Sequence, residues 1–120
     1  MQTTHSAEDL RTHMATVLRA AGSAPEEATT VAENLVEANL RGHDSHGVGM
    51  LPRYVEAVLE GGLKPNSKVH IRMDTGTLLN LDGQRGYGQA IGEASMKLGI
   101  DRAQQHGSCI MTLGNTHHLG

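Results

Sequence analysis

The 120-residue sequence predicts an α/β (α+β) protein in which three helices precede a strand-strand-helix-strand segment. Up to about residue 60, apolar residues recur at the three- and four-residue spacing of helices. From residue 69 the apolar pattern changes to the alternation of strands. A helical pattern then separates two strand patterns, as in a crossover between parallel strands. We therefore divide the chain into a helical region, 1–66, and the beginning of a sheet domain, 67–120.

The first two helices each open with a capping signature. Ser6, followed three residues later by an acidic residue, is a variant of the capping box, and Gly22 fits the position that ends the helix. Ser23 repeats the signature, with Pro25 in the first turn, and predicts a second helix that runs to about Leu40.

A Gly-His-Asp-Ser-His-Gly segment interrupts the helical pattern before the third helix. Asp44 or Ser45 can cap this third helix, which a pair of glycines ends. His46, Met50 and Tyr54 are spaced by four residues, so that they share one face if the segment is helical. That face would offer a ring nitrogen and a phenol to one ligand. Alternatively, the tyrosine is a half-buried core residue.

The second half of the chain alternates strands and a helix. Residues 69–73 and 77–81 predict two strands, and the turn residues at 74–76 join them. A glycine-rich stretch leads into a helix over 87–105. The strand predicted at 108–113 follows it and ends in a loop that carries two adjacent histidines.

Composition and charge exclude several classes of protein. The sequence has no Phe, no Trp and two Tyr, so its core is aliphatic or is completed by a further part of a larger protein. A net charge of -3 without a basic run argues against nucleic-acid binding. No apolar run reaches the ~20 residues that span a membrane, and the N-terminus lacks the pattern of a signal peptide. A single cysteine fits a reducing compartment, and we expect a soluble cytoplasmic protein.

The glycines at 86, 88 and 92 are a weak candidate for a dinucleotide-binding loop. They follow a strand and open a helix, which is the required context. Their spacing is not the strict fingerprint, and the next strand ends without an acidic residue for a ribose hydroxyl. Turns and close helix packing explain these glycines better.

Histidines provide two further candidates for chemistry. His43, His46, His117 and His118 cluster in two glycine-bounded segments, and three of them could bind a metal ion. No nearby acid or cysteine completes a familiar spacing, and capping or surface roles are the alternative. A histidine in the loop after a strand is also well placed for proton transfer, because ligands of open α/β sheets bind at the carboxyl ends of strands.

Three stretches are distinctive when taken together: Arg-Gly-His-Asp-Ser-His-Gly-Val-Gly-Met-Leu-Pro-Arg-Tyr-Val at 41–55, the glycines at 61 and 62, and Asn-Thr-His-His-Leu-Gly at 115–120. They resemble the type 2 malate/L-lactate dehydrogenase family, most closely its hydroxycarboxylate dehydrogenase branch. The resemblance implies an enzyme that transfers a hydride between NAD or NADP and a 2-hydroxy acid or 2-oxo acid. It implies a non-Rossmann, mixed-sheet cofactor domain beside a helical region. Family chains are longer and typically dimeric. We therefore expect an N-terminal fragment that is inactive alone and forms a homodimer at full length.

The resemblance also assigns roles to individual residues. His118 matches the general acid/base, and His46 and Gly120 match positions that contact the cofactor. Ser45 and Tyr54 match positions that line the substrate pocket. The alternative from the residues themselves is a metal-dependent hydrolase or lyase that uses His43, His46 and His118.

One position departs from the family pattern. Several relatives have an arginine at the position of Met50, where it can hold the substrate carboxylate through two hydrogen bonds. Methionine cannot form these bonds. Arg53, three residues later, or Arg41 could take over this contact, and we assign Arg53 to the substrate site.

Overall fold

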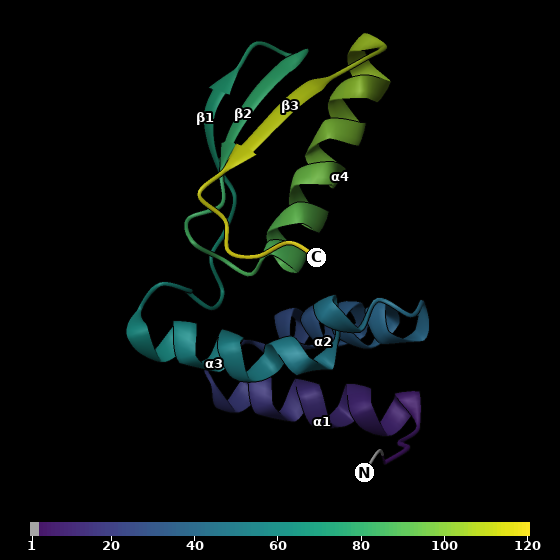
Figure 1. The fold of residues 1–120 in the computed structure, drawn as a ribbon. Coiled ribbons are helices and arrows are strands. Elements are labelled where there is room, and N and C mark those ends of the chain that lie inside the picture. Colours follow the sequence, from purple (N-terminus) through teal and green to yellow (C-terminus); the bar gives the residue numbers. More distant parts are fainter. Residues whose placement is uncertain (1–2) are drawn as a thin grey trace. The chain divides into compact units, whose positions relative to one another are not determined.

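The computed structural model describes residues 3–120 and divides them into two compact units, 3–66 together with Gly120, and 67–119 (Figure 1). The first unit is helical, and the second is a three-stranded sheet with one long helix. The elements are α1 (Ala7–Ala20), α2 (Pro25–Leu40), the 3-10 turns η1 (Asp44–His46) and η2 (Val48–Met50), α3 (Leu51–Glu60), β1 (His70–Asp74), β2 (Leu78–Asp82), α4 (Gly88–His106) and β3 (Ile110–Gly114). The predicted α/β class is confirmed.

The start of α1 follows the predicted capping signature. The Ser6 Oγ accepts a hydrogen bond from the backbone N–H of Asp9 at 3.1 Å. This contact satisfies one of the N–H groups that a helix leaves without an internal partner. Gly22 follows the helix with a φ of 109°, a conformation that glycine adopts without steric cost.

The predicted cap of α2 is wrong, because the N-cap residue is Ala24 and not Ser23. The Ser23 hydroxyl is buried and donates to Glu27 at 2.8 Å, one turn into the helix. The cap comes from Asn66, whose Oδ1 accepts from the Ala24 backbone N–H at 2.7 Å. Its own N–H donates to Glu27 at 2.9 Å, and its side-chain amide donates to the Gly22 carbonyl at 2.8 Å. The end of the helical unit therefore holds the start of α2.

Removing the Asn66 side chain should destabilise this unit. We expect Asn66→Gly to lower the free energy of unfolding by about 1 kcal/mol, the usual effect of losing a helix cap. Asn66 has a φ of 63°. Asn66→Ala should therefore lower it further, because alanine disfavours this backbone conformation. Urea unfolding of the three proteins measures both effects. An Asn66→Gly variant as stable as the wild type would contradict the assigned cap.

The segment before α3 forms two 3-10 turns rather than the start of a helix. Met50 is the N-cap of α3 without a side-chain hydrogen bond, so the predicted capping by Asp44 or Ser45 is wrong. The reason is Asn39 of α2, which donates to the Asp44 carboxylate at 2.9 Å and accepts from the Val48 N–H at 2.8 Å. These bonds hold the segment in turns.

The predicted shared face of three residues is also wrong. His46 lies in η1, Met50 in η2 and Tyr54 in α3, so they do not follow one helix. The α3 helix itself ends as predicted, at Gly61 with a φ of 84°. Tyr54 is fully buried, as is Tyr87 in the other unit, so the two tyrosines supply the large rings of an otherwise aliphatic core.

The sheet of the second unit has the order β1-β2-β3. Strands β1 and β2 pair antiparallel with an irregularity between Ile71 and Met73, and β2 pairs parallel with β3. The α4 helix connects the parallel strands, as the crossover pattern predicted, and packs beside the sheet (Figure 1). Each strand begins one or two residues later than predicted. Leu79, Leu81 and Ile91 are buried and form the core of this unit.

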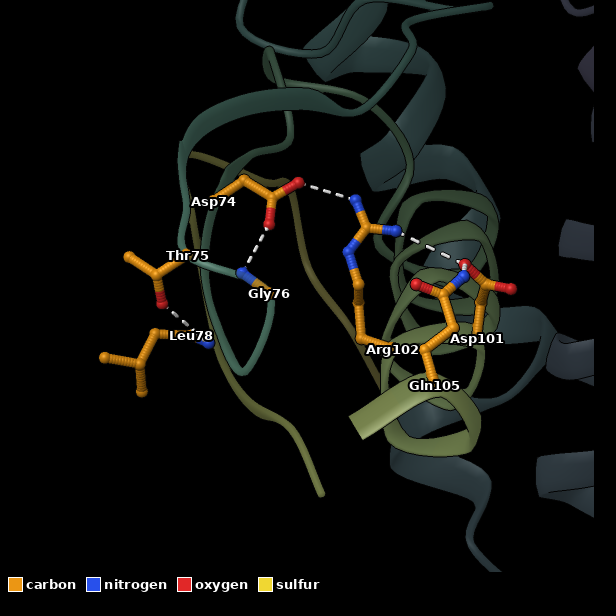
Figure 2. A network of polar contacts seen from close by, with 7 residues as sticks. All are labelled: Asp74, Thr75, Gly76, Leu78, Asp101, Arg102 and Gln105. Carbon is orange, nitrogen blue, oxygen red and sulfur yellow. Dashed lines mark hydrogen bonds and ion pairs between the residues drawn. The ribbon is translucent and has the colours of Figure 1, made fainter. Parts of the chain in front are cut away.

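A charged network joins the β1–β2 turn to α4 (Figure 2). The Asp74 carboxylate accepts from Arg102 at 2.5 Å and from the Gly76 backbone N–H at 2.9 Å. Arg102 also contacts Asp101 at 3.2 Å, and Gln105 donates to the same carboxylate at 3.0 Å. The bond from Arg102, followed by the bond from Gly76, lowers the pKa of Asp74 below its ordinary value.

In residues 3–120, no helix is long and apolar enough to cross a membrane.

Candidate functional site

Residues 114–119 are the last residue of β3 and the chain that follows it; they lie at the carboxyl end of the parallel strand pair and are called the histidine segment below. It runs beside the 83–88 loop, and three backbone hydrogen bonds join the two. Gly83 N–H donates to the Gly114 carbonyl at 2.9 Å, and Arg85 N–H donates to the Asn115 carbonyl at 2.8 Å. His117 N–H donates to the carbonyl of residue 86 at 2.9 Å. These bonds give His118 a defined backbone position beside the start of α4.

The glycines of the 83–88 loop make room for the protein's own chain. A Cβ added at Gly88 would lie 2.2 Å from the His118 carbonyl oxygen, and one at Gly83 would lie 2.9 Å from the Thr116 Cβ. A Cβ at Gly86 would lie 2.8 Å from Ile91 and 2.9 Å from Ser67. An added Cβ at Gly92 would lie 2.6 Å from Leu119, so the glycines at 86, 88 and 92 all lie at close contacts, as their interpretation as packing residues predicted.

Asp82, the last residue of β2, connects the loop to the histidine segment. Its Oδ1 accepts from the Gln84 backbone N–H and from the Asn115 side-chain amide, both at 2.8 Å. Its Oδ2 accepts from Arg72 at 3.0 Å. The bond from Gln84, followed by the bond from Asn115, lowers the pKa of Asp82 below its ordinary value, because both donors favour the charged carboxylate.

The two aspartates with lowered pKa values should make stability depend on pH in the acid range. A carboxylate whose folded pKa is below its unfolded value contributes stability above that unfolded value, and the contribution is lost as pH falls through the folded pKa. We expect thermal stability to fall below about pH 4, close to the ordinary pKa of aspartate. The loss should be smaller in an Asp74→Asn/Asp82→Asn variant and unchanged in a control at the exposed Glu56, Glu56→Gln. Equal acid dependence in all three proteins would contradict these pKa shifts.

The site residues predicted in the helical unit lie around η1. The Ser45 hydroxyl is 2.9 Å from His46 Nδ1, and the rings of His43 and His46 are tilted with centroids 4.2 Å apart. Gly47 is buried and packs against Asn39. A Cβ added at Gly47 would lie only 2.1 Å from the Asn39 Oδ1, so the position has no room for a side chain. Asn39 therefore fixes the segment that presents His46, which is half-buried.

The candidates for substrate binding differ in exposure. Tyr54 is fully buried in α3, whereas Arg53 is exposed and Met50 is half-buried. Arg41 is exposed and forms an ion pair with Glu37 one turn earlier, at 2.6 Å. Of the two arginines considered for the substrate carboxylate, Arg41 is thus already paired with Glu37 of α2.

His118 and Gly120, the remaining predicted residues, differ in exposure. His118 is half-buried and Gly120 is exposed. In the described part of the chain, no group of three or more His, Cys, Asp or Glu side chains is arranged to hold a metal ion.

Three residues that support the site were missed by sequence reasoning. The Asn39 amide bonds Asp44 and Val48, five and nine residues later, and the Asn115 amide bonds Asp82, 33 residues earlier. No sequence pattern of asparagine predicts such contacts. Asp82 had a partial signal, since Asp-Gly favours a turn in which the carboxylate accepts the N–H two residues later. Its second contact spans 33 residues and has no local signature.

The fold and this segment together define a mixed-sheet α/β chain with a histidine held at the end of its parallel strands. The family model described as malate/L-lactate dehydrogenase matches residues 5–120. The chain therefore belongs to the malate/L-lactate dehydrogenase family.

Individual relatives agree with this membership. The chain is 43% identical over 114 residues to a hydroxycarboxylate dehydrogenase B of Escherichia coli O157:H7, covering 95% of this chain and 32% of that protein. The solved structure of malate dehydrogenase from Pyrococcus horikoshii OT3 matches with a TM-score of 0.93 and 36% identity, over 98% of this chain and 34% of the other. Sulfolactate dehydrogenase from Methanocaldococcus jannaschii matches with a TM-score of 0.91 and 30% identity, over 96% and 33%. The chain thus spans about a third of the length of these relatives.

Proposed function

We propose that the chain is the N-terminal part of a longer oxidoreductase that interconverts a 2-hydroxy acid and a 2-oxo acid with NAD or NADP. The observation that carries the proposal is the histidine segment. Its backbone is held at the carboxyl end of the parallel strands, where ligands of open α/β sheets bind. The metal-dependent hydrolase or lyase has no support among the relatives, whose names are those of dehydrogenases.

His118 is the proposed general acid/base. When bound, the nicotinamide cofactor supplies or accepts the hydride. In the reducing direction the His118 imidazolium gives its proton to the carbonyl oxygen of the 2-oxo acid. In the oxidising direction its neutral ring takes the proton of the hydroxyl group. Imidazole suits both steps because it exchanges a proton near neutral pH.

The cofactor and substrate contacts are assigned to residues whose positions fit them. His46 and Gly120 are both accessible, and the Ser45 hydroxyl orients the His46 ring, so these residues fit a cofactor contact. Arg53 is exposed and presents a guanidinium, which suits a substrate carboxylate. Tyr54 is fully buried in this structure, so its place in the substrate pocket is proposed from the family resemblance alone.

Three further properties belong to the same proposal. We assign residues 1–66 to a helical region and residues 67–120 to the beginning of a cofactor-binding sheet domain. The full-length protein acts in the cytoplasm, where Cys109 of this chain would stay reduced. It forms a homodimer, as the family resemblance implies. Size-exclusion chromatography with light scattering of the full-length protein tests the last of these.

The test of the proposed function is an absorbance assay on the full-length protein. Reduced NAD or NADP is supplied together with a panel of 2-oxo acids, with and without a chelator. We expect cofactor oxidation that depends on the 2-oxo acid and is insensitive to the chelator. No oxidation with any member of the panel, or activity that is lost with chelator, would contradict the proposal. The ranking of substrates would also show whether Met50 permits larger side chains.

A further inference from the structure

We propose that Asp82 and Asn115 form a clamp that positions His118 for proton transfer. This inference rests on the proposed function of His118. Asp82 would be a positioning residue, since it acts on the histidine through the backbone of the histidine segment. The clamp consists of the Asp82 Oδ1 and its two donors, the Gln84 N–H and the Asn115 side-chain amide, both at 2.8 Å.

The clamp holds backbone that would not keep its conformation alone. Gln84, Arg85 and Asn115 have φ values of 50°, 60° and 54°, in the left-handed region that residues other than glycine rarely adopt. Such residues persist where the surroundings hold them, and they cluster at functional sites. Here a single carboxylate oxygen of Asp82 holds both the loop at Gln84 and the start of the histidine segment at Asn115. It accepts from the backbone of the first residue and from the side chain of the second. The Asn115 carbonyl in turn accepts from Arg85 N–H at 2.8 Å.

The clamp extends to His118 through a short and constrained stretch of chain. The clamp fixes the beginning of the histidine segment at Asn115, three residues before His118. Between them, His117 N–H donates to the Gly86 carbonyl at 2.9 Å. At the end, the His118 backbone lies directly against Gly88, where there is no room for a Cβ. Because the chain between Asn115 and His118 is short and constrained, a shift of Asn115 should also move His118. Displacing a catalytic group by about 1 Å can lower a rate by about 100-fold.

A merely structural role for Asp82 is the competing explanation, and Asp74 is its matched control. Asp74 also ends a strand, also accepts from a backbone N–H two residues later, and also pairs with an arginine (Figure 2). Both aspartates have a pKa below the ordinary value. Asp74 bonds Gly76 in the β1–β2 turn and Arg102 of α4, and neither of these bonds involves the histidine segment. Loss of either network should destabilise the sheet, but only loss of the Asp82 network should move His118.

The experiment compares four variants of the full-length protein with the wild type by steady-state kinetics, thermal unfolding and hydrogen exchange of the 114–119 segment. Asp82→Ala removes the clamp, and Asn115→Gly removes the amide while permitting the left-handed backbone. Asp82→Asn keeps an oxygen acceptor, Asp74→Ala is the control, and the wild type is the reference. We expect Asp82→Ala and Asn115→Gly to lower kcat by about 10- to 100-fold, with KM changed less than about threefold. Asp82→Asn should recover most of kcat, and Asp74→Ala should retain it despite lower thermal stability.

Hydrogen exchange separates this proposal from the proposed function. The His117 N–H should exchange faster in Asp82→Ala and Asn115→Gly but not in Asp74→Ala, whether or not the wild type has dehydrogenase activity. Unchanged exchange in Asn115→Gly, which tests the clamp even if Asp82→Ala fails to fold, would overturn the inference. So would a kcat loss in Asp74→Ala as large as in Asn115→Gly. An inactive wild type would instead refute the dehydrogenase function and leave the clamp to be judged by the exchange rates.

Discussion

Replacing His118 with alanine in the full-length protein is expected to lower kcat for 2-oxo acid reduction by about 100- to 10,000-fold. The methyl group of alanine cannot give a proton to the carbonyl oxygen, so solvent must do so in a site where it is not positioned. The binding of the reduced cofactor, measured by fluorescence titration, should change little, because the proton transfer and cofactor contacts are assigned to different residues.

His13 provides the control for this substitution. It is an exposed histidine on α1, and His13→Ala should leave kcat close to that of the wild type. Turnover by His118→Ala within a few-fold of the wild type would show that another group is the general acid/base. A large loss of cofactor affinity in the same variant would show that His118 contributes to binding instead.

Replacing Gly88 with alanine should have the next largest effect. An added Cβ would lie 2.2 Å from the His118 carbonyl oxygen and 2.6 Å from its carbonyl carbon. Both are backbone atoms, so the histidine segment or the start of α4 must shift. We expect kcat to fall by about 100-fold, the order expected for a displacement of about 1 Å, together with lower thermal stability.

Gly99→Ala is the matched control in the same helix. A Cβ there would lie 3.5 Å from the Met111 sulfur, which is ordinary contact. Alanine also favours the helix interior by about 0.5–1 kcal/mol over glycine, so this variant should be as stable as the wild type or more stable, with unchanged kcat. The contact between Gly88 and the histidine segment would be contradicted if Gly88→Ala were equally stable and active.

The elements that could be predicted from sequence are those whose signals are local. The capping of α1 by Ser6, the end of α3 at Gly61 and the crossover through α4 depend on residues within a few positions or on apolar periodicity. The cap of α2 could not be predicted, because its Asn66 partner is 42 residues away. The same limit applies to the turns at η1 and η2. There an asparagine of the preceding helix overrides the helical spacing of the sequence.

The candidate site shows the same division between local and distant signals. Motifs that resemble a known family marked the histidine segment and the η1 segment, and each is held by backbone or side-chain contacts in its own unit. The resemblance did not identify what holds them. Asn39 bonds Val48, nine residues later, and Asp82 bonds Asn115, 33 residues later, so both contacts lie outside the spacings of a helix or a turn. Polar residues of these types are also common on any surface. Only the hydrogen-bond distances in the structure show that these residues hold the two segments.

The measurement that tests the central claim most directly follows the transferred hydrogen. The full-length protein is incubated with a 2-oxo acid and a reduced nicotinamide cofactor deuterated at the transferable position, and the product is analysed by mass spectrometry. We predict a 2-hydroxy acid with one deuterium on the carbon that carries the hydroxyl group, formed far more slowly by His118→Ala. A product without deuterium on that carbon, or equal rates for the two proteins, would contradict hydride transfer assisted by His118.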